Sequence, residues 1–405
     1  MTPTDLTELL QRLDAHAARH SLLNQYFAGE QPMTFLPADV REQLNRRLDR
    51  VSVNVPRLLV DSIVERLRIV GFDRSDVWPM WRANDLDQMA AVAHRETLVL
   101  GESYAIVWAR PDGRPLVSVE SAQQVAAEVD PATRELVRAV KRWEAKDGTH
   151  AVVYGPDEVV RYRSRNPGAT TTGFEVVERI ENPLGVPPVV RFVNGGRLLD
   201  QARSEMHDVL ALTDAAVKLA TDMLTASEYG ARPRRWATGL ELIEDDEGET
   251  VSPIREDDRM MVNEAAEGKF GQLPGSDLAG YEASIGVVMR LISAVSGLPE
   301  HLLGIGGDNP TSADSIRASE AALTARAEAH QLAFGRAWGR VAALMVAARD
   351  GSDPTALTIT PQWADPATRN SAQEADATLK LVAAGVLSVA EARQRLGITE
   401  GGAAA

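Results

Sequence analysis

The pattern of apolar positions predicts helices in the first part of the chain. Near the N-terminus, apolar residues recur every three or four positions, the spacing of one helix face, at Leu6, Leu9, Leu10 and Leu13. The same spacing returns at Leu58, Leu59, Ile63 and Leu67. Pro56 fits the first turn of that second helix, and Gly71 would end it. Residues 85–100 predict a further helix that ends at Gly101.

From there to residue 194, short apolar runs of strand length replace the helical spacing. Turn-forming pairs such as Asp130-Pro131 and Gly155-Pro156 separate them. The predicted strands are 104–108, 116–119, 125–129, 136–143, 151–154, 159–162 and 174–180. Strands this closely spaced indicate an antiparallel sheet and not alternating β-α-β units.

Long helices are predicted for most of the remaining chain. One begins near Ser204 and ends at Gly230, and another runs from Ser276 to Gly297. The longest spans 312–349, which contains no proline and only two glycines. At 1.5 Å per residue such a helix would be roughly 50 Å long, which suits a framework element. Two shorter helical stretches follow residue 365.

Composition narrows the class of protein. The 405 residues include no cysteine, which excludes disulfides, thiolate metal sites and thiol nucleophiles and fits a reducing cytoplasm. The longest uninterrupted apolar run, Val341–Ala348, is far short of the roughly 20 residues of a membrane-spanning helix. Residues 1–10 lack the basic start and apolar stretch of a secretory signal. We therefore expect a soluble, cytoplasmic protein of several units.

The negative charge is concentrated in one quarter of the chain. The formal net charge is −15, and residues 200–299 alone contain 9 Lys and Arg against 19 Asp and Glu. A pI near 5.0 argues against a protein that holds nucleic acid by neutralising phosphates. Two interpretations stay open: a solubilising surface, or a passage that repels a polyanion and lets it slide.

Candidate catalytic and metal-binding motifs are weak. Gly268-Lys269 is followed by Phe270, not by the Ser or Thr of a Walker loop. His16 and His20 have the spacing of a zinc helix, but the Glu that would act as base is missing, and a solvent-facing helix surface is the better interpretation. The loop Gly304–Gly307 resembles a phosphate cradle, yet a helix and not a strand is predicted before it. The acidic run 244–249 lacks the ligand spacing of a calcium loop, which favours a solvated turn or a docking patch.

Several short stretches, taken in order, carry a resemblance to a known family. They are Tyr26–Gly29, Asn54–Asp61, Gly101–Val107, the proline-rich Asn182–Asn194, Ser296–Pro299 and the long helix Ser312–Arg349. With this order and spacing the chain resembles the portal proteins of tailed double-stranded DNA bacteriophages, of the siphophage type. The resemblance runs from about Tyr26 to Arg349.

The resemblance implies an α+β, mainly helical portal fold. It has a wing of antiparallel strands and helices, two stem helices, a small α/β clip, a long helix after a tunnel loop, and a short helical crown. The implied boundaries are 1–200 for the N-terminal part of the wing, 201–229 for stem helix 1, 230–275 for the clip, 276–297 for stem helix 2, 298–311 for the tunnel loop, 312–364 for the long wing helix and the following strand, and 365–405 for the crown.

The implied function is a ring, of twelve subunits in this family, at one capsid vertex. The ring is the channel for DNA packaging and ejection, and it is not an enzyme and needs no cofactor or metal. Its partners would be the terminase large subunit, the major capsid protein, scaffolding protein, a head-tail connector protein, and double-stranded DNA passing without sequence specificity; no membrane is involved. The protein would reside in the virion, after assembly in the host cytoplasm.

The resemblance also assigns two candidate sites. The tunnel loop facing DNA comprises Gly304, Ile305, Gly306, Gly307, Asp308 and Asn309. The clip docking surface comprises Glu244, Asp245, Asp246, Glu247 and Glu249. The competing hypotheses are a nucleotide-dependent enzyme that uses the Gly304–Gly307 loop, and a monomeric helical scaffold.

Overall fold

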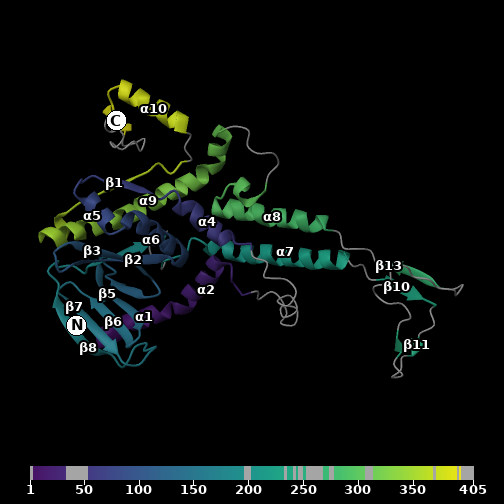
Figure 1. Ribbon diagram of the computed structural model, residues 1–405, viewed down its shortest axis with the longest axis horizontal. Coiled ribbons are helices and arrows are strands. Elements are labelled where there is room, and N and C mark those ends of the chain that lie inside the picture. Colours follow the sequence, from purple (N-terminus) through teal and green to yellow (C-terminus); the bar gives the residue numbers. More distant parts are fainter. Residues whose placement is uncertain are drawn as a thin grey trace, which may run out of the picture. The chain divides into compact units, whose positions relative to one another are not determined.

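The computed structural model describes most of the chain as two compact units (Figure 1). The first unit comprises residues 1–33, 54–213 and 290–405, and the second comprises 34–53 and 214–289. The described residues are 3–32, 53–195, 202–231, 235–239, 243–244, 250–251, 268–272, 278–305, 313–367, 371–389 and 392–393.

A three-stranded antiparallel sheet lies at the centre of the first unit. Its middle strand is β2 (Glu102–Ala109), flanked by β3 (Pro115–Ser121) and β9 (Val189–Val193). Successive side chains of a strand point to opposite faces, and Tyr104–Val107 are all buried, so both faces of β2 are covered. Helices α6 (Leu86–Leu100) and α9 (Ala313–Asp350) both pack against β2.

A five-stranded antiparallel sheet forms the second layer of this unit. Its strands follow one another in chain order: β4 (Val125–Val129), β5 (Leu136–Ala145), β6 (Gly148–Tyr154), β7 (Glu158–Ser164) and β8 (Glu175–Glu181). Helix α1 (Pro3–Ala15) covers one face. Its four leucines at helical spacing, Leu6 to Leu13, form one core with apolar residues of β4 to β7. Periodicity in the sequence therefore placed both the helix and its buried face.

The remaining described elements of the first unit are short helices and one strand pair. They are α2 (Ala17–Ala28), α4 (Val55–Val64), α5 (Val77–Ala83), the 3₁₀ turns η1 (His207–Val209), η2 (Glu300–Leu303) and η3 (Pro354–Ala356), α10 (Ser371–Ala383), and β1 (Ile69–Phe72) paired with β14 (Pro361–Trp363). The prediction that a helix continues to Gly71 is wrong. Helix α4 ends at Val64, because residues 69–72 pair with a strand almost 300 positions away, which local spacing cannot reveal.

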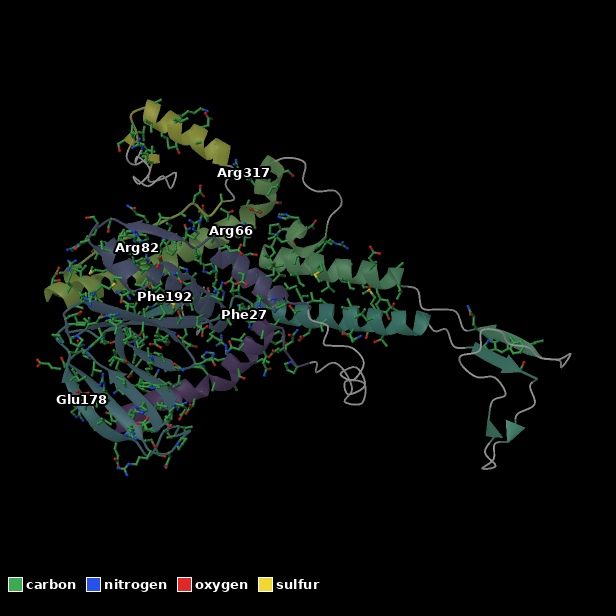
Figure 2. All side chains as sticks on the ribbon, in the orientation of Figure 1. Phe27, Arg66, Arg82, Glu178, Phe192 and Arg317 are labelled. Carbon is green, nitrogen blue, oxygen red and sulfur yellow. The ribbon has the colours of Figure 1, made fainter. Side chains whose placement is uncertain are left out.

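An aromatic cluster fills the space between α5, α6, α9 and β9. Trp81, His94, Phe192, Phe334 and Trp338 are all buried. The Trp338 ring lies 4.6 Å from that of Phe192 and 4.8 Å from that of Trp81, centroid to centroid. Figure 2 labels Phe192 within this unit. These rings fix α9 against the central sheet.

The second unit contains the larger parts of two helices and two strand pairs. Helix α7 (Leu210–Ala231) enters it at Asp214, and α8 (Ala279–Ser296) leaves it after Met289. In the sequence between them, β10 (Arg235–Thr238) pairs with β13 (Lys269–Gln272), and β11 (Ile243–Glu244) pairs with β12 (Thr250–Val251). Both pairs are antiparallel. Within the described part of the chain, no helix is long and apolar enough to cross a membrane.

The structure confirms the mixed fold expected from the sequence. The strands between 101 and 194 form antiparallel sheets, and the long proline-free stretch forms α9, of 38 residues. Helix α6 ends where expected, with Gly101 in the left-handed conformation at φ 97°. A Cβ at Gly101 would lie 2.8 Å from the backbone of Ala202, so this glycine also permits close approach of the chain before η1.

The two glycines of α9 allow a second close approach, which yields a testable prediction. A Cβ at Gly339 would lie 2.3 Å from the Ile359 carbonyl oxygen, and one at Gly335 would lie 3.2 Å from Nε1 of Trp363. Alanine stabilises a free helix by about 1 kcal/mol over glycine. We expect Gly339→Ala to lower the free energy of unfolding nevertheless, by about 1–3 kcal/mol, because backbone must move to relieve the overlap.

Chemical denaturation of the two proteins measures this difference. Gly280→Ala is the matched control, since that helical glycine has nothing within 4 Å of an added Cβ. It should leave stability unchanged or raise it. A Gly339→Ala protein as stable as the parent would contradict the packing of α9 on residues 357–363.

Candidate functional site

Four polar residues from three distant parts of the first unit meet at Glu205. Asn194 follows β9, Glu205 precedes η1, and Arg326 and His330 lie four residues apart on one face of α9. The segment that carries Glu205 is fixed to the end of α6, where the Glu205 backbone N–H donates to the Leu98 carbonyl at 2.8 Å. We call these four side chains the Glu205 junction.

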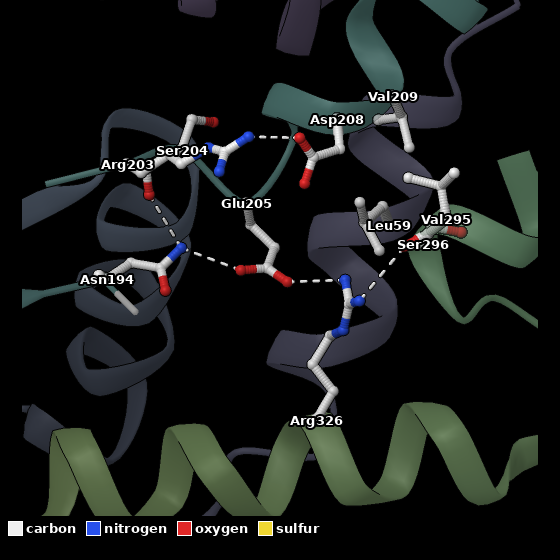
Figure 3. A pocket seen from close by; sticks show the side chains of 11 residues that line it. Leu59, Asn194, Arg203, Ser204, Glu205, Asp208, Val209, Val295, Ser296 and Arg326 are labelled. Carbon is white, nitrogen blue, oxygen red and sulfur yellow. Dashed lines mark hydrogen bonds and ion pairs between the residues drawn. The ribbon is translucent and has the colours of Figure 1, made fainter. Parts of the chain in front are cut away.

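The Glu205 carboxylate has a partner on each oxygen (Figure 3). Arg326 donates to Oε1 at 2.9 Å, and the side-chain amide of Asn194 donates to Oε2 at 2.9 Å. Nε2 of His330 lies 3.5 Å from Oε2. Asn194 also donates to the Arg203 carbonyl at 3.0 Å, and Arg203 pairs with Asp208. The junction thus joins β9, the approach to α7, and α9.

The junction holds Glu205 in its ionised form. Burial opposes ionisation of a carboxyl group, and the Glu205 side chain is only 12% exposed. The neighbouring His330, Arg326 and Asn194 groups outweigh that burial and lower the pKa of Glu205 to about 2. A buried charge of this kind is stable only while its partners stay in place.

A cavity of about 230 Å³ opens beside the junction. Its apolar wall comes from Leu59 of α4, Val209 of η1 and Val295 of α8. Arg326 also donates to the Val295 carbonyl at 3.4 Å. The cavity therefore marks the place where, within the first unit, the start of α7 and the end of α8 meet α4 and α9.

The end of α8 is fixed by the motif Ser296-Gly297-Leu298-Pro299. The Ser296 hydroxyl donates to the Ile292 carbonyl at 2.7 Å and accepts the Leu298 N–H at 3.1 Å. Gly297 takes the left-handed conformation, with φ at 72°, and Leu298 is buried. A Cβ at Gly297 would lie 3.4 Å from Cβ of Ala322, so the helix end lies close to α9. The sequence correctly predicted that the helix stops at this motif.

The turn after this motif is tied to α9 by a second buried carboxylate. Arg66 forms an ion pair with Glu320 of α9, with 3.1 Å between a terminal guanidinium nitrogen and Oε2. Nε2 of His301 in η2 lies 3.7 Å from Oε1 of the same carboxylate. Gly304 ends η2 with φ at 68°, and the Ile305 N–H donates to the Glu300 carbonyl at 3.1 Å. The turn η2, which leads into the predicted tunnel-loop residues from Gly304 on, is therefore anchored to α9. We call this turn the base of the loop.

The structure describes only part of the predicted sites. Gly304 and Ile305 lie at the base just described, whereas Gly306, Gly307, Asp308 and Asn309 lie outside the described residues. Glu244 is in the short strand β11. Asp245, Asp246, Glu247 and Glu249 also lie outside the described residues.

The alternatives raised by the sequence find little support in the geometry. Helix α8, and not a strand, leads to the Gly304 loop, as predicted. His16 and His20 stand with ring centroids 5.9 Å apart, and His20 is buried, so the surface interpretation fails for His20. Within the described ranges, no three His, Asp or Glu side chains form a group that could hold a metal ion.

Sequence reasoning missed the Glu205 junction. Arg326 and His330 are four apart on the predicted long helix, which was the only local signal of a shared face. Glu205 lies 121 positions before Arg326, and nothing in its own neighbourhood distinguishes it from other acidic residues of an acidic region.

Comparison with known proteins gives consistent matches along the chain. The family model described as "Phage portal protein, SPP1 Gp6-like" matches residues 3–403. The portal protein of Mycobacterium phage L5 is 30% identical over 398 residues, covering 92% of this chain and 80% of its own. The portal protein of Mycobacterium phage D29 is 31% identical over 403 residues, covering 92% and 81%.

Solved structures are similar at lower identity. A chain from the neck of a native gene transfer agent particle, computed with C12 symmetry, has a TM-score of 0.49 and 15% identity, covering 90% of this chain and 94% of its own. A chain from the virion of the native gene transfer agent particle has a TM-score of 0.48 and 13% identity, with the same coverage.

Proposed function

This chain belongs to the SPP1 Gp6-like family of phage portal proteins, and we propose that twelve copies of it form the ring at one capsid vertex. It is a structural component of a bacteriophage virion, and the ring is the channel for the packaging and ejection of DNA. The observation that carries this conclusion is the family match across residues 3–403, together with two portal proteins at 30% and 31% identity.

We assign the parts of the portal along the boundaries expected from the sequence. Residues 1–200 and 312–364 form the wing, 201–229 and 276–297 the two stem helices, 230–275 the clip, 298–311 the tunnel loop and 365–405 the crown. The positions of α7 and α8, on either side of the short strands β10 to β13, support this assignment. So does the division into units, which falls at Asp214 and after Met289, inside those helices.

The channel function fits the charge of this part of the chain. Residues 200–299 carry 19 acidic against 9 basic side chains, and carboxylates release a polyanion where Lys and Arg would retain it. We propose that Gly304–Asn309 contacts passing DNA transiently, from the base that His301 and Glu320 hold. Replacing 304–309 with a bulky, rigid segment should reduce packaging; unchanged packaging would contradict this role.

The proposed partners are the terminase large subunit, the major capsid protein, scaffolding protein and a head-tail connector protein. We place terminase docking at the acidic clip residues Glu244, Asp245, Asp246, Glu247 and Glu249. Reversing Asp245, Asp246 and Glu247 to lysine should weaken terminase retention in a pull-down, and equal retention would contradict this site. The portal itself performs no catalysis in this scheme, and assembly takes place in the host cytoplasm.

The ring is tested directly by negative-stain electron microscopy and native mass spectrometry of the purified protein. We expect rings with a central hole and a mass near twelve times 43.9 kDa. A stable monomer at high concentration, with no rings after scaffolding protein is added, would contradict the proposal. A thermal shift with nucleotide in that monomer would then favour the enzyme hypothesis.

A further inference from the structure

A small basic pocket lies in the first unit, away from the Glu205 junction. It occupies about 210 Å³ between the α1–α2 connection, the β2–β9 edge and β4. Its polar lining comprises Arg12, His16, Arg19, His20, Glu102, Tyr104 and Arg191. A water molecule takes about 30 Å³ of liquid volume, so the pocket has room for an ion of several heavy atoms. Arg12 belongs to α1, His16 to the turn between the helices, and Arg19 and His20 to α2.

The one carboxylate in this pocket is already paired. Arg191 donates to Oε2 of Glu102 through Nε at 2.6 Å and through its terminal nitrogen at 2.5 Å. Arg191 lies directly opposite Tyr104 across β2 and β9, so strand pairing positions it beside Glu102. Glu102 therefore neutralises Arg191 and leaves the remaining cations uncompensated.

Two guanidinium groups of the pocket have no carboxylate partner among the described residues. Arg19 donates to the Ala202 carbonyl at 2.6 Å, which orients it without neutralising it. Arg12 has neither a hydrogen-bond partner nor an ion-pair partner in the described part of the chain. Both belong to the same pocket, so their positive charges add there.

The acidic residues of α1 cannot neutralise these arginines, because they already pair with two arginines of β5. Asp5 and Glu8 pair with Arg138 at 2.6 and 3.3 Å. Asp14 pairs with Arg142 at 2.5 Å. The positive charge of the pocket is therefore not balanced by the described carboxylates of this helix.

His20 adds a buried polar group to the same pocket. It is 4% exposed, and its Nδ1 is sealed from solvent without a hydrogen-bond partner among the described residues. Burial is the main reason that the pKa of His20 is lowered, so the ring is neutral at pH 7. A neutral imidazole holds its proton where the proton can be hydrogen-bonded. Because Nδ1 has no partner, we assign the proton to Nε2, from which a bound oxyanion would accept a hydrogen bond.

We propose that this pocket binds a small oxyanion, a phosphate or a carboxylate group, between Arg12, Arg19 and His20. Arginine presents paired N–H donors that match the oxygens of either group, and charge-assisted bonds of this type are the strong ones. The paired Glu102 limits the surplus charge, so the pocket suits one small anion and not a nucleic-acid backbone. This site is independent of the portal assignment.

Isothermal titration of the full chain with sodium phosphate, at constant ionic strength set by sodium chloride, tests the site. We expect saturable binding of one phosphate per chain, and Arg12→Gln should weaken it about tenfold through loss of a charge-assisted contact. Arg12 is exposed, so this variant should fold normally, which its thermal unfolding checks. Arg165→Gln removes another exposed arginine, which follows β7, and should leave the affinity unchanged.

A parallel titration with sodium acetate identifies the group that the pocket prefers. Tighter phosphate binding assigns the site to phosphate, and tighter acetate binding assigns it to a carboxylate, such as an acidic side chain of another protein. Either result supports the oxyanion site. Heats that match a chloride titration for both anions would overturn it, as would an equal loss of affinity in Arg12→Gln and Arg165→Gln.

Discussion

Replacing Glu205 with glutamine should lower the free energy of unfolding of the monomer by about 1.5–3 kcal/mol, the range for losing hydrogen bonds to a charged group. The variant leaves Arg326, whose side chain is 32% exposed, beside a neutral amide. Glutamine keeps the size of the side chain, so the loss reports on charge and not on packing. Urea denaturation followed by circular dichroism measures the difference.

The same carboxylate makes acid stability a second readout. The pKa of Glu205 is about 2 in the folded protein, against an ordinary value of 4.5. A carboxyl whose pKa is lowered by folding contributes stability above its unfolded pKa and loses it as the pH falls toward the folded value. The parent protein should therefore lose about 3 kcal/mol between pH 4.5 and 2 through this group. The Glu205→Gln protein should lack that part of the acid transition.

An exposed ion pair of the five-stranded sheet is the control. Glu178 pairs with Arg161 at 2.9 Å, and its side chain is 49% exposed. Figure 2 labels Glu178 among the side chains of this unit. Glu178→Gln should change stability by less than about 1 kcal/mol, because water screens exposed pairs. If both variants lost the same stability, the Glu205 junction would have no special role.

The junction also shows what the sequence could and could not predict. Apolar spacing and turn residues predicted α1, α6, α9 and the strands β2 to β8, whereas β9 (Val189–Val193) was not predicted as a strand. The partners of Glu205 come from segments that meet only after the chain folds, and polar residues carry no periodicity that would pair them. Gly339 is an intermediate case. A glycine in a long helix indicates close approach, but only the structure identifies Ile359 as the neighbour.

The predicted functional sites also combine local features that the sequence reveals with contacts that only the folded chain creates. The motif 296–299 correctly predicted the end of α8, because a residue in the left-handed region, usually glycine, is a local requirement of such a helix end. The base of the following loop depends on His301, Glu320 and Arg66, which are brought together by α9 and α4. The roles assigned to Gly304–Asn309 and to the acidic clip residues remain predictions from the family resemblance.

Trp338→Ala should remove about 3–5 kcal/mol of stability, the range for truncating a large buried aromatic side chain. The Trp338 ring is fully buried against Trp81 and Phe192, and its Nε1 donates to Nε2 of His94 at 2.8 Å. Trp338→Phe separates the two contributions. It keeps an aromatic ring in the cluster but leaves Nε2 of His94 without a donor, so the loss should be about 1–3 kcal/mol.

The Trp338 hydrogen bond also fixes the charge of His94. Nε2 of His94 accepts the hydrogen bond from the Trp338 N–H, so the neutral ring must carry its own proton on Nδ1. Burial, with the charge of His330 next, lowers the pKa of His94 to about 3. As the pH falls from 6.5 to 3, only the unfolded chain binds this proton. His94 should therefore lower the free energy of unfolding by about 1.4 kcal/mol for each pH unit of that fall.

His94→Gln tests this assignment, because an amide oxygen can accept from Trp338 but cannot titrate. Its stability should vary less steeply with pH than that of the parent between pH 6.5 and 4.5, where Glu205 stays ionised. Equal slopes in the two proteins would mean that His94 takes up a proton in the folded state, which a Trp338 N–H aimed at Nε2 does not allow. The aromatic cluster would then need a different arrangement from the one that packs α9 on the central sheet.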